Sequence, residues 1–111
     1  MSDEVYQHVA NGKVIAMWGF RYRGFLTQDV DAWLLTAEEV AEHKVQFARE
    51  TSRWVDRILS RTHGSMYVEV HATYLDAVKW LLWLGFKRVD TRIVGRDTFI
   101  VMRKDWGQWA F

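Results

Sequence analysis

The sequence predicts an α+β domain: a mixed, mainly antiparallel sheet with two main helices, in the order β-β-β-α-β-α-β-β. Strand-like apolar patterns alternate with two segments whose apolar residues recur at helical spacing. Asn11-Gly12 and the turn at residues 95–97 mark two hairpins. The chain has 111 residues, enough for one core, so we expect a single domain over residues 1–111.

Composition excludes several classes of protein. No run of 18 apolar residues is present, and the acidic start has no apolar stretch behind it, so neither a transmembrane helix nor a signal peptide is expected. Cysteine is absent, which excludes disulfides and thiol nucleophiles and fits a reducing cytosol. A net charge of +1 gives no global field, so neither nucleic acid nor membrane is expected as a partner.

The strand expectations follow from local patterns. The expected strands are residues 5–10, 13–20, 32–35, 65–71, 87–94 and 98–104. Residues 14–18 are nearly all apolar, so we expect the second strand to be buried on both faces. Residues 21–31 form a polar loop around Gly24. Trp18, Trp33 and Trp54 lie in patterned context and are interpreted as core residues.

The first helix is expected to begin with a capping box, in which Thr36 and Glu39 satisfy each other's backbone N–H groups. Gly64 is expected to end it in a left-handed conformation. Its polar side carries a row of arginines: Arg49, Arg53, Arg57 and Arg61. We interpret this row as a solvated face partly paired with Glu50 and Asp56, and an anion-binding stripe is the alternative.

The second helix is expected to open at Thr73, with Asp76 completing a weaker capping box. Only Asp76 and Lys79 are charged in this segment, so we expect the helix to be buried on most sides. Gly85-Phe86 ends the helix, and Phe86 is expected to fold back onto the last turn.

Large aromatic side chains predict a contact surface. Residues 104–111 form an aromatic C-terminal tail, and such side chains are costly to leave in water. The residues expected to bind a protein partner or a second copy of the chain are Trp80 and Trp83 of the second helix and Trp106, Trp109 and Phe111 of the tail.

Residues 77–86, Ala-Val-Lys-Trp-Leu-Leu-Trp-Leu-Gly-Phe, resemble a segment of the GCN5-related N-acetyltransferases (GNATs). In that family an alanine-containing helix beside the thiol end of acetyl-CoA runs into a Leu-Gly-Phe ending. The element order is similar to the GNAT core from its second strand onward. The resemblance implies a truncated GNAT-like fold without the family's first strand and first two helices.

The chain also resembles small GNAT-like virion assembly or internal virion proteins of T7-type podoviruses, through residues 33–36 and the Trp-Leu-Gly-Phe ending. This second resemblance implies a phage protein located in the host cytoplasm or the virion.

Tight binding of acetyl-CoA is not expected. GNAT enzymes seat the pyrophosphate on the backbone of a glycine-rich loop at the start of the long helix. Residues 36–42 contain no glycine and three carboxylates, which would occupy the anion site themselves. If acetyl-CoA binds, the candidates for contacts are Thr36, Arg49 and Arg53.

The sequence offers three catalytic candidates. The family's usual acid, a tyrosine four residues before the glycine of Leu-Gly-Phe, is replaced here by Leu81, and Tyr74 could substitute from another turn. Glu69 and His71 share one strand face and could act as a base, or they are ordinary outward polar residues. The remaining histidines show no metal spacing, so no metal is expected.

Three functions remain open. The leading hypothesis is a non-enzymatic phage protein that acts in virion assembly, or as an internal virion component, through protein contacts. The alternatives are a small acetyl-CoA-dependent N-acetyltransferase with an atypical phosphate loop and a phage-encoded inhibitor of a host protein.

Overall fold

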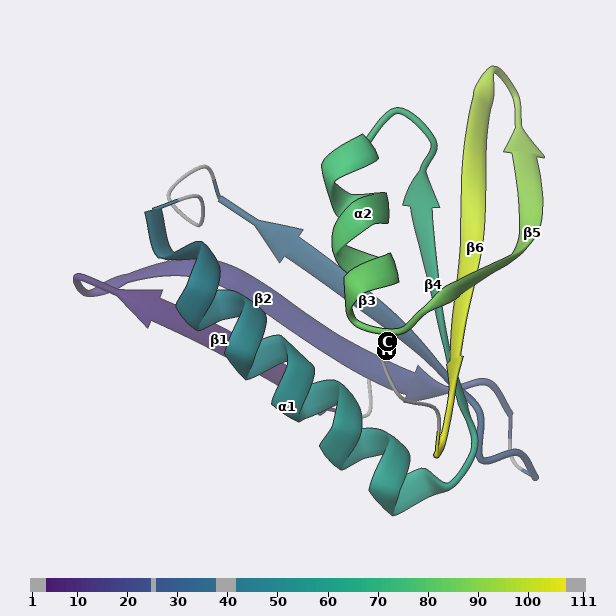
Figure 1. Ribbon diagram of the computed structural model, residues 1–111, viewed down its shortest axis with the longest axis horizontal. Coiled ribbons are helices and arrows are strands. Elements are labelled where there is room, and N and C mark those ends of the chain that lie inside the picture. Colours follow the sequence, from purple (N-terminus) through teal and green to yellow (C-terminus); the bar gives the residue numbers. More distant parts are fainter. Residues whose placement is uncertain (1–3, 25, 38–41, 108–111) are drawn as a thin grey trace.

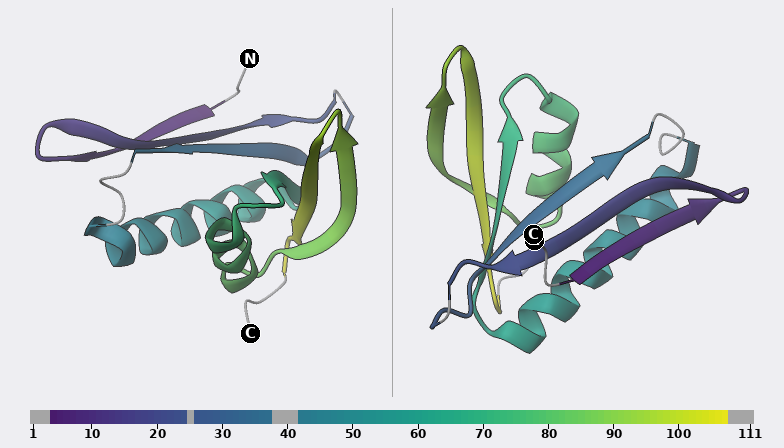
Figure 2. Two further views of the ribbon diagram at one scale, coloured as in Figure 1. Left: turned by 90° about the horizontal axis from the view of Figure 1, so that it is seen from above. Right: turned by 180° about the vertical axis from the view of Figure 1, so that it is seen from behind.

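The computed structural model describes residues 4–24, 26–37 and 42–107. Six strands form one sheet in the order β1-β2-β3-β4-β6-β5, and two helices lie on one of its faces (Figures 1 and 2). The strands are β1 (Glu4–Ala10), β2 (Lys13–Tyr22), β3 (Val30–Thr36), β4 (Ser65–His71), β5 (Lys87–Val94) and β6 (Asp97–Asp105). The helices are α1 (Lys44–Thr62) and α2 (Leu75–Trp83). The predicted class and element order are confirmed.

Both predicted hairpins are present. Asn11 and Gly12 have φ values of 53° and 76°, as a type I′ turn requires, and they connect β1 to β2. The turn between β5 and β6 contains Gly95 with a φ of 61°. These turns fix the antiparallel register of both ends of the sheet.

The core lies between the helices and the sheet. From β2, Ala16, Trp18 and Phe20 alternate toward α1, where Trp54 and Ile58 meet them. Burial of Trp18 and Trp54 is therefore confirmed. The expected burial of β2 on both faces is confirmed only for its centre, because Ile15 and Gly19 on the other face are buried whereas Val14 is exposed.

Trp33 does not join that core. In β3 it lies on the sheet face opposite the helices, half-buried over Gly19, where a Cβ atom would stand 2.8 Å from the indole ring. The interpretation of Trp33 as a core residue is wrong, because alternation along β3 turns Ala32 and Leu34, not Trp33, toward the helices.

The expected start of the first helix is also wrong. Thr36 is the last residue of β3, and α1 begins at Lys44 after His43, with no side-chain hydrogen bond capping it. The Ala37 N–H donates to the Ile15 carbonyl at 2.8 Å, so pairing with β2 extends past Thr36 and prevents the cap. Glu39 lies outside the described residues.

The end of α1 is set differently from the sequence expectation. His63, with a φ of 57°, takes the left-handed position and donates its N–H to the Leu59 carbonyl. Gly64 is needed because a Cβ atom there would stand 2.3 Å from the carbonyl oxygen of Gln28. The loop before β3 therefore packs directly on the Gly64 backbone.

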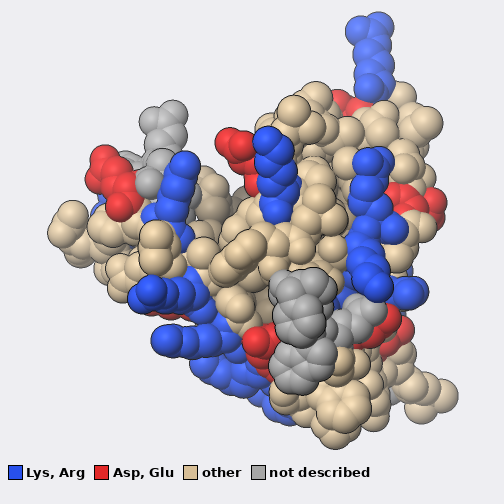
Figure 3. All heavy atoms as spheres, in the orientation of Figure 1, with Lys and Arg blue, Asp and Glu red and all other residues tan. Residues whose placement is uncertain are grey.

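The arginine row on α1 is exposed, and Figure 3 shows basic side chains along this helix. The expected pairing with Glu50 and Asp56 is wrong. Glu50 contacts His8 at 2.5 Å, and Asp56 contacts Lys104 at 3.3 Å. These contacts tie α1 to β1 and β6, because the two acids lie on the flanks of the helix rather than on its outermost side.

The second helix begins two residues later than expected, at Leu75, and its start has no side-chain cap. The Thr73 hydroxyl is instead bonded to His71 at 2.7 Å. Within α2 only Leu81 is buried, so the expectation of a helix buried on most sides is wrong. Phe86 is buried and its N–H donates to the Leu81 carbonyl at 3.0 Å, which confirms its return onto the helix.

Replacing Gly64 by alanine should destabilise the fold by about 2 kcal/mol, the typical cost of forcing an extra carbon into a packed site. The clash is with backbone, which cannot rotate away. Gly24→Ala is the matched control, since its added carbon would lie 3.8 Å from Thr27. Urea denaturation measures both. Equal midpoints would show that Gly64 is not under this constraint.

Candidate functional site: the cleft between two diverging strands

A cleft opens where β3 and β4 separate. These neighbouring strands run parallel and pair at Val30–Met66 and Asp31–Tyr67, and beyond these positions they diverge (Figure 1). The cleft has a volume of about 1260 Å³, larger than the roughly 300–1,000 Å³ typical of small-molecule pockets. Its narrow end is the short β3–β4 junction, and Thr36 and His71 lie where β3 and β4 end, at its open end.

The helices form an apolar wall of the cleft. Trp54 from α1 and Ala77, Trp80 and Leu81 from α2 line it. Trp80 stacks on Phe47 of α1, with ring centroids 5.7 Å apart, so the two helices meet through aromatic contact. This wall suits an uncharged, partly apolar ligand segment.

Lys104 fixes the end of α2. Its side chain is buried, and Nζ donates to the Leu84 carbonyl at 2.8 Å and lies 3.3 Å from Asp56 of α1. One cation therefore links β6, α1 and the carboxyl end of α2. This link sets where α2 stands beside the cleft.

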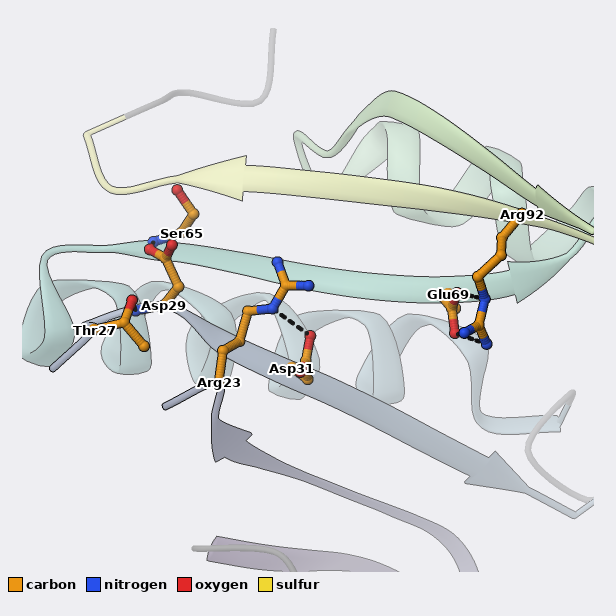
Figure 4. Close-up of polar contacts among 7 residues, drawn as sticks. All are labelled: Arg23, Thr27, Asp29, Asp31, Ser65, Glu69 and Arg92. Atoms are coloured by element: carbon orange, nitrogen blue, oxygen red, sulfur yellow. Dashed lines mark hydrogen bonds and ion pairs between the residues drawn. The ribbon is translucent and has the colours of Figure 1, made fainter. Parts of the chain in front are cut away.

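Charged side chains form the two lips of the cleft on the sheet face opposite the helices (Figure 4). On the β3 side, Arg23 Nε lies 3.3 Å from Asp31, and the guanidinium lies 4.1 Å from the centre of the Tyr67 ring. On the β4 side, Arg92 holds Glu69 through two contacts, of 2.7 and 3.0 Å. We call these the Arg23–Asp31 pair and the Arg92–Glu69 pair.

The loop that carries Arg23 is held by hydrogen bonds. The Arg23 N–H donates to the Asp29 carbonyl at 3.0 Å. The Asp29 carboxylate accepts from the Ser65 N–H at 2.8 Å, and the Asp29 N–H donates to the Thr27 hydroxyl at 3.0 Å (Figure 4). The loop is thereby attached to the start of β4, beside the narrow end of the cleft.

Tyr67 lies between two guanidinium groups at this narrow end. Arg23 covers its ring, and Arg103 of β6 is hydrogen-bonded to its side chain. That hydrogen bond, together with the nearby Asp105 carboxylate, raises the pKa of Arg103. Tyr67 is therefore fixed in place across the β3–β4 junction.

The three catalytic candidates named from sequence all line the cleft. Glu69 and His71 share the face of β4 opposite the helices. His71 contacts Asp97 at 3.0 Å through Nε2 and Thr73 at 2.7 Å through Nδ1, so both ring nitrogens are engaged. Tyr74 is mostly exposed, and its ring centroid lies 5.6 Å from that of His71. Of the three, Glu69 lies nearest the narrow end along β4.

The candidates for cofactor contacts are not brought together. Thr36 lines the cleft, but Arg49 and Arg53 lie on the outer surface of α1, beside a separate shallow hollow. Leu81, at the position of the family's acid, is buried and carries no proton donor.

The start of α1 is less acidic than the sequence suggested. Because the helix begins at Lys44, its first turn contains no acidic residue. Glu42 precedes the helix and is exposed, and Glu38 and Glu39 lie outside the described residues. The sequence-based expectation of weak acetyl-CoA binding thus loses part of its basis.

The predicted contact residues differ in exposure. Trp83 is 57% exposed, whereas Trp80 is half-buried against Phe47. Trp106 is 51% exposed and lies 4.4 Å from the His63 ring, between centroids. Trp109 and Phe111 lie outside the described residues. Exposed apolar side chains are therefore present at α2 and at the end of β6.

Sequence reasoning missed four of the charged or aromatic residues at the lips: Arg23, Asp31, Tyr67 and Arg92. Arg23 and Asp31 were assigned to a polar loop, and Arg92 to an ordinary hairpin. The alternation of polar residues along the strands was their available signal. Within the described part of the chain, no cluster of acidic or histidine side chains could hold a metal ion, and neither helix could cross a membrane.

Replacing Lys104 by methionine should destabilise the fold by about 1–3 kcal/mol, because the buried Leu84 carbonyl then loses its donor. Lys79→Met, on the exposed side of α2, is the control and should change the free energy of unfolding by less than about 0.5 kcal/mol. Denaturant unfolding monitored by tryptophan fluorescence measures both. An unchanged midpoint for Lys104→Met would contradict the proposed link.

Comparison with known proteins defines the fold. No protein-family model matches the sequence, and neither does any curated protein. The ribosomal-protein-S18-alanine N-acetyltransferase of Escherichia coli superposes with a TM-score of 0.75 at 18% identity, over 92% of this chain and 68% of that one.

Two further structures give similar values. A GNAT-family acetyltransferase of Streptococcus pneumoniae superposes with a TM-score of 0.76 at 13% identity, over 93% of this chain and 66% of its own. The protein yncA of Salmonella typhimurium, solved with acetyl-CoA, gives 0.73 at 16%, over 96% and 66%. The chain thus spans about two thirds of the length of these proteins. It has the fold of the GNAT N-acetyltransferases.

Proposed function

We propose that the protein binds acetyl-CoA in the cleft and transfers the acetyl group to an amine. The observation that carries the proposal is the separation of β3 from β4 after two residue pairs, which opens a deep cleft beside an apolar wall. The yncA structure, which has the same fold, contains acetyl-CoA.

The cleft suits the central part of this substrate. The pantetheine arm of acetyl-CoA is a narrow chain with two amides, and an extended segment can hydrogen-bond to an open strand edge. Beyond Asp31 and Tyr67, the diverging strands offer such edges. Trp54, Ala77 and Trp80 cover the methylene groups of the arm from the helix side.

The phosphate groups belong at the open end. The amino-terminal end of α1, a helix of 19 residues, favours negative charge, and its first turn contains Lys44 and no acidic residue. Thr36 adds a hydroxyl at this end. Arg49 and Arg53 point away from the cleft on the helix surface, so we do not assign them to the phosphates.

The chemistry requires a base near the narrow end. When an amine nitrogen attacks the thioester carbonyl, a C–N bond forms, the C–S bond breaks and the nitrogen loses a proton. We assign Glu69 on the β4 lip as the carboxylate that takes a proton from the acceptor nitrogen and makes it nucleophilic. A thiolate is a good leaving group because thiol pKa values lie near 8.5, so Leu81 at the acid position does not prevent transfer.

A non-enzymatic role in phage virion assembly is the competing proposal, with inhibition of a host protein as a variant of it. It is supported by the missing acid at Leu81 and by exposed apolar side chains: Leu75, Leu82, Trp83 and Trp106. In that case the cleft would bind no substrate, and the exposed apolar side chains would bind another protein.

Calorimetry with acetyl-CoA tests the proposed function. We expect a dissociation constant below roughly 10 μM, about −7 kcal/mol, and we expect Ala77→Trp to abolish binding by filling the cleft. Lys79→Trp, on the exposed side of the same helix, should bind like the wild type. No binding by the wild type would overturn the proposal, and binding by Ala77→Trp would place the site elsewhere.

Light scattering tests the competing contact surface. If the exposed tryptophans form an interface between copies, the intact protein will exceed its monomer mass of 13.2 kDa, and Trp83→Ser with Trp106→Ser will restore that mass. Val9→Ser, an exposed position on β1 at the sheet edge opposite β6 and β5, is the control. A monomeric wild-type protein leaves this surface without a role in self-association.

A further inference from the structure

The two lips of the cleft each present a carboxylate next to a guanidinium. Arg23 and Asp31 form the β3 lip, and Glu69 and Arg92 form the β4 lip (Figure 4). The four charges sum to zero. A site for a polycation would show an excess of carboxylates, and a site for a polyanion an excess of cations, so neither kind of acceptor suits these lips.

Both arginines come from outside the strands that form the cleft. Arg23 follows the end of β2, and its guanidinium is positioned by the Tyr67 ring. Arg92 lies on β5 and reaches over β6 to Glu69 on β4. Two separate parts of the chain therefore bring guanidinium groups to the lips of one cleft.

These pairs can be opened at little cost. The Arg92 and Glu69 side chains are 60% and 39% exposed, and ion pairs this exposed to water contribute little to stability. A ligand with one cationic and one anionic group can pair with Glu69 and Arg92 in turn, and these two contacts replace the ion pair that opens. The contact of Arg92 with Glu69 is also two-pronged, which is the geometry in which arginine binds any carboxylate.

We propose that the acceptor is a free α-amino acid, whose ammonium binds Glu69 and whose carboxylate binds Arg92. This inference rests on the proposed function, because it names the second substrate of the same cleft. In an α-amino acid the two charges are adjacent, as they are in the Arg92–Glu69 pair. A peptide amino terminus lacks the adjacent carboxylate, and a polyamine would face Arg23 and Arg92 with like charge.

All bonds and protons of the acetyl transfer can be accounted for with the two substrates, Glu69 and water. Glu69 takes one proton from the bound ammonium, and the neutral nitrogen attacks the thioester carbonyl. The C–N bond forms, the C–S bond breaks, and the nitrogen gives up its second proton to water. CoA leaves as a thiolate and takes up a proton from Glu69 or solvent. Arg92 holds the acceptor carboxylate throughout and touches no reacting atom.

The test compares acceptors that differ only in the α-carboxylate. Acetyl transfer is measured with glutamate, lysine and phenylalanine, with the α-carboxamide of each, with spermidine and with a short peptide. We expect at least one free amino acid to exceed its own carboxamide roughly tenfold or more in kcat/KM, the effect of losing one charge-assisted contact. Spermidine and the peptide should be poor acceptors.

Arg92→Gln isolates the positioning role. It should raise KM for the amino acid roughly tenfold with kcat nearly kept, and it should remove the preference over the carboxamide. Arg92→Lys should restore part of the preference, because the charge returns without the two-pronged geometry. Arg88→Gln, on the opposite face of β5, should behave like the wild type.

The outcomes separate the two proposals. If acetyl-CoA binds but spermidine, the peptide or the carboxamides are preferred, or no acceptor reacts, the amino acid inference is overturned and acetyl-CoA binding stands. If Arg92→Gln keeps the preference, Arg92 does not hold the carboxylate. If acetyl-CoA does not bind at all, the proposed function falls and this inference with it. Thermal melts and acetyl-CoA calorimetry confirm that each variant is folded.

Discussion

The two residue pairs Val30–Met66 and Asp31–Tyr67 join the two halves of the sheet, and the site depends on how short this junction is. Parallel strands gain stability from each further hydrogen-bonded pair, so their separation must be supported by packing elsewhere. α1 and α2 supply it: Trp54, Trp80 and Leu81 pack below the widening gap, where a continuous sheet would otherwise close. The cleft is therefore a consequence of core packing.

The same packing holds the wall of the cleft in place. Trp80 stacks on Phe47, and Lys104 joins α2 to α1 and β6. Lys104 is buried while its partner Asp56 is 64% exposed, so the carbonyl of Leu84 is the more important contact of the two. A lysine there, rather than an apolar residue, satisfies the last carbonyl of a helix that ends inside the fold.

Local features of the fold could be predicted from sequence, and features that depend on distant contacts could not. The Asn11-Gly12 hairpin was predictable because its turn geometry is specified by two adjacent residues. The cap at Thr36 was not, because Ala37 bonds to Ile15 on β2. Likewise, Glu50 and Asp56 were expected to pair along the helix, but His8 and Lys104 from other elements hold them.

The same distinction between local patterns and distant contacts applies to the candidate site. Glu69 and His71 could be named because they share one strand face, and Tyr74 because it stands near the start of the helix that the resemblance covers, but nothing in the local pattern linked Arg92 or Arg23 to them. Those contacts require the strand order β3-β4-β6-β5. This order places β3 beside β4, and it places β5 one strand away from β4, with β6 between them.

The side chains that this strand order brings together also matter for catalysis without a general acid. An enzyme that relies on a thiolate leaving unaided has to gain its rate from placing the amine and its base correctly. In the proposed reaction, the guanidinium groups that two other elements bring to the lips would orient the acceptor, and the missing acid at Leu81 would not prevent transfer.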